Sequence, residues 1–109
     1  MKYKIKINRQ EIESIIYVLN VFLNGEHLEI HDEVKFRELR NYFLLVSTPV
    51  TKVYEVTLTE DQMFFIWISI KTALEDKLII DEGRVTQIIP IMTLFAATLD
   101  HIREEKKDE

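Results

Sequence analysis

Two short segments of the chain alternate apolar and polar residues with a period of two, which is the pattern of a half-buried strand. The apolar sides are Tyr3, Ile5 and Ile7 within residues 2–7, and Tyr54, Val56 and Leu58 within residues 53–58. We therefore predict two strands with their apolar faces on the core. Antiparallel pairing is the arrangement we favour, because two related units usually meet about a local twofold.

Each predicted strand leads directly into the start of a helix. Asn8 with Glu11, and Thr59 with Gln62, have the spacing of a capping box, in which the cap side chain and the third helical residue bond each other's backbone amides. Apolar residues flank both caps, as in a hydrophobic staple. The first helix then continues to the stop at Asn24-Gly25.

A second helix follows in each half of the chain. We predict the first of these from about Asp32 to Ser47, because Pro49 disfavours helix at the residue before it. The start of the last helix is ambiguous. A cap at Asp81 would place Pro90 inside the helix and kink it, whereas a cap at Thr86 would place Pro90 harmlessly in the first turn. We favour the later start, and we expect the charged chain after Arg103 to fray at its end.

The order of elements is therefore strand, helix, helix, twice. The predicted fold class is α+β, with four helices packed on a two-stranded sheet in one domain. Unit one covers about residues 1–49 and unit two about 50–104, and a charged tail covers 105–109. With the copies aligned at a shift of 51, the identical pairs are Tyr3 and Tyr54, Ile15 and Ile66, and Leu23 and Leu74. Internal duplication and simple likeness between two strand-helix segments both remain open interpretations.

Composition narrows the function classes. A chain of 109 residues that is 47% hydrophobic and 30% charged forms one domain in water. With 2 Gly and no Cys, it lacks disulfides, thiolate zinc sites, cysteine nucleophiles and glycine-rich nucleotide loops. Residues 63–68, the longest apolar run, are too few to span a bilayer, and the N-terminal lysines interrupt any export signal. We expect a cytoplasmic protein without membrane contact.

The predicted third helix has a second apolar face, formed by Phe64, Phe65 and Ile68. A helix that is apolar all round is buried on every side, so a central place in the domain is the interpretation we favour for it. The other interpretation is the interface of a homodimer, because aromatic residues are enriched at interface centres.

Two polar clusters are candidate binding sites. His27, Glu29 and His31 share one face of an extended segment and could hold a metal ion, but a solvated connection explains them better, and we expect neither metal nor cofactor. Lys2, Lys4, Lys6 and Arg9 form a basic group that could meet phosphates. The net charge of −5 argues against nucleic acid as a partner.

The serines lack a Gly-x-Ser-x-Gly elbow, and the carboxylates fall at caps, first turns and the tail. The leading hypothesis is therefore a small non-enzymatic protein-interaction domain that associates with itself or with another protein. The alternative is a small-molecule or metal-binding domain, and the third hypothesis is a regulator that binds nucleic acid.

Overall fold

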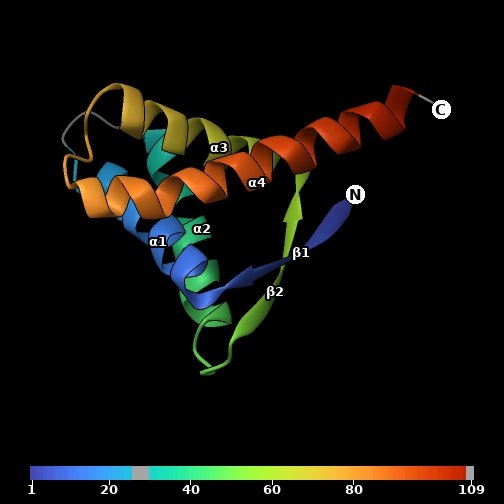
Figure 1. Ribbon diagram of the computed structural model, residues 1–109, viewed down its shortest axis with the longest axis horizontal. Helices are drawn as coiled ribbons and strands as arrows, with labels where there is room; N and C mark the ends of the chain where they lie inside the picture. Colours follow the sequence, from blue (N-terminus) through green and yellow to red (C-terminus); the bar gives the residue numbers. More distant parts are fainter. Residues whose placement is uncertain (26–29, 108–109) are drawn as a thin grey trace.

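The computed structural model describes residues 1–25 and 30–107 of the chain. Four helices pack with a two-stranded antiparallel sheet, as the α+β prediction requires (Figure 1). The elements in chain order are β1 (Lys2–Asn8), α1 (Arg9–Leu23), α2 (Ile30–Val46), β2 (Val53–Thr59), α3 (Glu60–Glu75) and α4 (Glu82–Lys107).

Both capping boxes are present. Asn8 Oδ1 accepts a hydrogen bond from the Glu11 amide at 2.8 Å, and Glu11 Oε1 accepts one from the Asn8 amide at 2.8 Å. At the start of α3, Thr59 Oγ1 accepts from the Gln62 amide at 3.1 Å, and Gln62 Oε1 accepts from the Thr59 amide at 2.9 Å. Each strand therefore passes into its helix with no intervening loop.

The strand register is symmetric about the pair Ile5 and Val56. These two residues are also equivalent under the shift of 51, so an internal twofold axis passes through the middle of the sheet. Lys6 lies opposite Glu55, and Lys4 Nζ is 3.9 Å from Glu55 Oε1, so the charges on the outer face partly compensate. The register is what internal duplication would produce, but duplication remains an interpretation.

The inner face of the sheet and the four helices enclose one core. Helix α1 contacts α2, α3, α4 and β1, and it is therefore the central helix (Figure 1). Its residues Ile12, Ile15 and Leu19 have no exposed surface. The preferred interpretation that placed the third helix at the centre is wrong.

The two second helices break the internal symmetry. Helix α4 packs along both α1 and α3, whereas α2 packs on α1 and reaches β2 (Figure 1). The Tyr42 hydroxyl of α2 accepts a hydrogen bond from the Thr57 amide at 2.7 Å, which satisfies a donor at the outer edge of β2. Helix α2 packs mainly on α1 and meets α3 only marginally, so the outer side of α3 is partly uncovered in the described part of the chain.

Helix α4 begins earlier than expected and contains Pro90 in its interior. Asp81 Oδ1 accepts from the Arg84 amide at 3.2 Å, so the start at Thr86 is wrong. Packing on α1 explains the early start, because Ile88 is fully buried and the Arg84 guanidinium lies 4.7 Å from the Tyr17 ring centre. The free energy of these contacts offsets the loss of the backbone hydrogen bond that Pro90 cannot donate.

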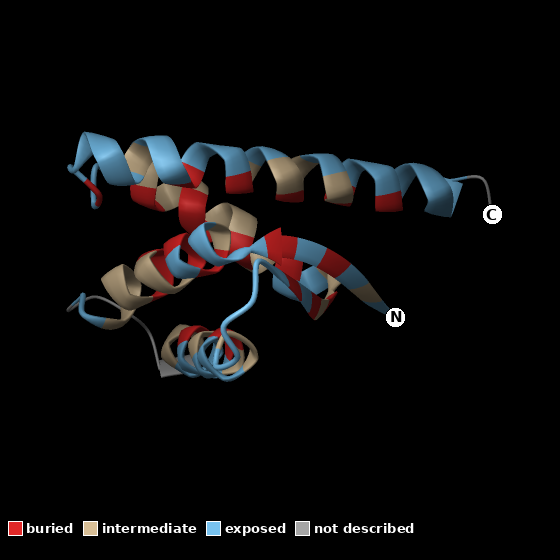
Figure 2. Cartoon of the chain, turned by 60° about the horizontal axis from the view of Figure 1, so that its bottom comes forward, coloured by how far each residue is buried: buried red, intermediate tan, exposed pale blue. Residues whose placement is uncertain are grey.

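The other end of α4 remains helical through Lys107. Lys106 pairs with Glu60 at the start of α3, which ties this end to the body of the domain. Among the described residues, α4 is also the one helix long and apolar enough to cross a membrane by length and composition, with a mean hydropathy of 1.3 over an 18-residue window. One side of it carries the buried positions (Figure 2), and these are Ile88, Ile91, Phe95, Leu99 and Ile102. These five positions face the core and account for part of the apolar composition of the helix.

Candidate interaction surface

Helix α3 buries one side and leaves the opposite side open. The buried side consists of Met63, Ile66, Ser69, Ile70 and Ala73. On the other side, Phe64 is 42% exposed, and Phe65, Trp67 and Ile68 are half-buried. We call these four apolar residues the α3 surface. The expectation that this helix is buried on every side is wrong, because α2 reaches only its Phe65 side.

The aromatic rings of the α3 surface are held by their neighbours. The Phe64 and Trp67 ring centres are 5.9 Å apart, and the Phe65 ring centre is 4.7 Å from that of Phe36 on α2. Lys35 Nζ lies 5.6 Å from the Phe65 ring centre and Lys71 Nζ lies 5.3 Å from the Trp67 ring centre. The two lysine cations further stabilise the Phe65 and Trp67 rings in these positions, so the surface is preorganised for binding.

Grooves flank the α3 surface on both sides. A groove of about 450 Å³ lies between α2 and α3, lined among others by Leu39, Phe64 and Phe65. A second groove, of about 430 Å³, lies between α3 and α4, where Trp67 faces Met92 and Ala96. Phe64 also borders a smaller hollow of about 150 Å³ beside α4. The surface is therefore a ridge between two depressions, a shape that a complementary protein surface can fit.

Comparison with α1 indicates that the fold does not require an aromatic residue at position 64. Phe64 is the fifth residue after the cap Thr59, and Glu13 is the fifth residue after the cap Asn8. Glu13 is exposed, and its carboxylate lies 3.2 Å from Arg9 Nε. A charged residue thus satisfies the same position in the sister helix, so helix formation does not require an aromatic ring there.

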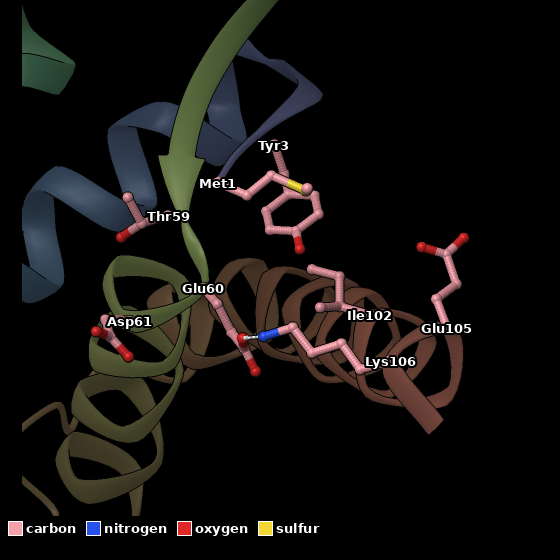
Figure 3. Close-up of a pocket in the computed structure, with 8 residues that line it drawn as sticks. All are labelled: Met1, Tyr3, Thr59, Glu60, Asp61, Ile102, Glu105 and Lys106. Atoms are coloured by element: carbon pink, nitrogen blue, oxygen red, sulfur yellow. Dashed lines mark hydrogen bonds and ion pairs between the residues drawn. The ribbon is translucent and has the colours of Figure 1, made fainter. Parts of the chain in front are cut away.

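A separate cavity of about 520 Å³ lies between the start of β1 and the end of α4. Tyr3 and Ile102 form an apolar wall, and the ion pair of Glu60 with Lys106 crosses beside them (Figure 3). The hydrogen bond from Lys106 lowers the pKa of Glu60 and, in return, raises the pKa of Lys106. Because the two charged groups already satisfy each other, the pair acts as a structural tie. Sequence reasoning missed it, since 46 residues separate the partners.

The basic group predicted from the sequence is divided in the structure. Lys2, Lys4 and Lys6 are exposed on the outer face of β1. Arg9 turns away, because its Nη1 donates to the Tyr54 hydroxyl at 2.8 Å and its Nε pairs with Glu13. The arginine is thus engaged in local structure, and the expectation that nucleic acid is not a partner stays a prediction.

The histidine cluster lies largely outside the described residues. His27 and Glu29 are not described, and His31 is described only as backbone in the first turn of α2. Within residues 1–25 and 30–107, no group of three metal-ligating side chains comes together. The metal-binding hypothesis is therefore not tested by the structure.

Comparisons with protein families, with curated proteins and with solved structures find no match to this chain.

Proposed function

We propose that this chain is a non-enzymatic protein-interaction domain that self-associates through the α3 surface. The observation that carries the proposal is Phe64, an aromatic ring that is 42% exposed beside three half-buried apolar side chains. An exposed apolar patch of this kind is typical of an interface in a folded protein. The fold itself does not demand it, since Glu13 occupies the same position of α1.

Other apolar residues are more exposed than Phe64, among them Leu45 and Val50 at and after the end of α2 and Ile80 before α4. Leu45 is 73% exposed on α2, and it is an aliphatic residue without an aromatic ring. Interface centres favour ordered aromatic residues over isolated aliphatic ones. Leu45 therefore serves as the matched control for the α3 surface.

Gel filtration with light scattering tests the proposal on the wild-type protein and on two variants, Phe64→Glu and Leu45→Glu. Both replace an exposed apolar side chain by the same charge. We expect the wild-type protein and Leu45→Glu to have a dimeric mass at micromolar concentration, and Phe64→Glu to have the monomeric mass of 13.0 kDa. A monomeric wild-type protein, or a dimer that only Leu45→Glu dissociates, would contradict the proposal.

A second candidate function is the binding of a small apolar molecule in the groove between α3 and α4. Trp67, Leu74, Met92 and Ala96 give it an apolar lining, and Lys71 at its rim could pair with a carboxylate. Trp67 is the sole tryptophan of the chain, so its fluorescence reports on this groove directly.

Titration with decanoate, followed by Trp67 emission, tests this second candidate. Binding predicts a saturable change of the emission that is weakened by Ala96→Leu, which fills the groove. A Trp67 emission that does not change with decanoate, or a change that is the same in Ala96→Leu, would rule out binding in this groove.

A further inference from the structure

On the outer stripe of α3, Asp61 precedes the apolar residues and Lys71 follows them, at equal distances from the middle of the stripe. Glu75, the last residue of the helix, pairs with Lys71. Asp61 precedes Ile66 by five residues and Lys71 follows Ile66 by five. Phe64 and Ile68 lie two residues before and after the same point. All four side chains reach the surface, because each is exposed or half-buried on the side of α3 opposite the core.

We propose that two copies of the chain pair through α3 in antiparallel orientation, about a twofold axis at the level of Ile66. The inference rests on the proposed function and specifies the partner of the same surface as a second copy of this chain. A twofold axis at this level places Phe64 opposite Ile68 of the second copy. It also places Asp61 of each copy opposite Lys71 of the other, so one apolar pair and one ion pair are each formed twice.

The charges select this orientation over the parallel one. In a parallel pair, Asp61 would meet Asp61 and Lys71 would meet Lys71, and both contacts would be repulsive. Inside one chain, Lys71 Nζ is 3.9 Å from Glu75 Oε1, but both side chains are about half exposed or more, so this ion pair is weak. Lys71 can therefore exchange this ion pair for one with a carboxylate on a second copy, at the cost of part of its contact with the Trp67 ring.

The central apolar contacts fit the same arrangement. Phe64 stands on the ridge between the two grooves, and Ile68 borders the groove on the α2 side. A ring from one copy can enter the groove beside Ile68 of the other while the reciprocal contact forms on the far side of the axis. Each copy thus supplies both a projecting ring and a receiving depression, which is the self-complementarity that an isologous interface needs.

Charge reversal tests the orientation. Asp61→Lys alone places a lysine opposite Lys71 twice, and Lys71→Asp alone places an aspartate opposite Asp61 twice. Each single variant should raise the dimer Kd about tenfold or more, because two attractive pairs become two repulsive ones. Mixing the two variants should restore association near the wild-type Kd, because both cross-chain pairs in the heterodimer are then attractive. Asp76→Lys, an exposed residue at the end of α3, is the control and should leave the Kd unchanged.

Sedimentation velocity on the single variants and on their equimolar mixture, with circular dichroism to check folding, separates the outcomes. Dissociation by Phe64→Glu together with unchanged Kd values for both reversals would overturn the antiparallel arrangement and leave the proposed function standing. Reversals that weaken association but do not complement each other in the mixture would also overturn it. A wild-type protein that is monomeric throughout would overturn the proposed function itself.

Discussion

Truncation of Phe64 to alanine separates the contribution of this ring to association from its contribution to folding. A phenylalanine has about 200 Å² of accessible surface, so the 42% that is exposed corresponds to about 84 Å² available for burial. At about 25 cal/mol per Å², complete burial contributes about 2 kcal/mol per copy. An isologous dimer contains the residue twice, so Phe64→Ala should weaken association by up to about 4 kcal/mol, or about 1000-fold in Kd.

The same substitution should cost the folded monomer less than the loss of a core ring. The roughly 58% of Phe64 that already faces the domain is about 116 Å² and contributes up to about 3 kcal/mol to the free energy of unfolding, and removing a partly exposed ring leaves no enclosed cavity. Phe95, which has no exposed surface, is the matched control, and Phe95→Ala should cost about 3–5 kcal/mol.

Sedimentation equilibrium gives the Kd, and urea unfolding at a concentration where the chain is monomeric gives the free energy of unfolding. A Kd that stays within a factor of two of the wild-type value would refute the reasoning. A loss of monomer stability as large as that of Phe95→Ala would refute it as well, because Phe64 would then be a core residue.

Three further predictions concern the fold that presents this surface. Replacing either cap, Asn8→Ala or Thr59→Ala, should lower the free energy of unfolding by about 1 kcal/mol, and equal losses in urea titrations would show that both boxes are intact in solution. Pro90→Ala should raise the free energy of unfolding by about 1–3 kcal/mol, because alanine restores the backbone hydrogen bond inside α4; a loss in thermal unfolding would mean that the domain needs the proline geometry. The pKa of Glu60 is lowered in the folded state, chiefly by the hydrogen bond from Lys106, so its contribution to stability is present above its ordinary value of 4.5 and is lost as the pH falls through the lowered pKa. The pKa of Lys106 is raised, so its contribution is lost only as the pH rises through the raised pKa, above 10.5. Lys106→Met should therefore lower the melting temperature near neutral pH and reduce the difference in melting temperature between neutral and acid pH. A melting temperature that depends on pH as in the wild-type protein would argue that the pair does not form.

The elements that the sequence predicted well depend on interactions between near neighbours. Asn8 and Thr59 bond amides three residues away, and the alternation of Ile5 and Val56 with polar residues follows from the geometry of a strand. Antiparallel pairing was expected from the likeness of the two units, and the structure has it.

The predictions that were wrong depended on packing between distant segments. The expectation that Pro90 lies in the first turn of its helix considers only neighbouring residues. In the structure, packing of Ile88 and Arg84 on α1 holds the earlier turns of α4 in place. The pattern around Phe64 showed an apolar second face without showing what covers it. The cover depends on the position of α2, which packs mainly on α1 and also accepts a hydrogen bond at the Tyr42 hydroxyl from the Thr57 amide of β2. Periodicity identifies apolar positions, but it does not say how many neighbours each one has.

The most direct test of the central claim is an isotope-filtered nuclear Overhauser experiment on a mixture of labelled and unlabelled protein, which detects only contacts between copies. The account predicts cross-peaks between the ring protons of Phe64 in one copy and the methyl protons of Ile68 in the other. Cross-peaks between copies that involve Leu45 and Val50 and omit Phe64, or a mixture with no such cross-peaks at millimolar concentration, would contradict it.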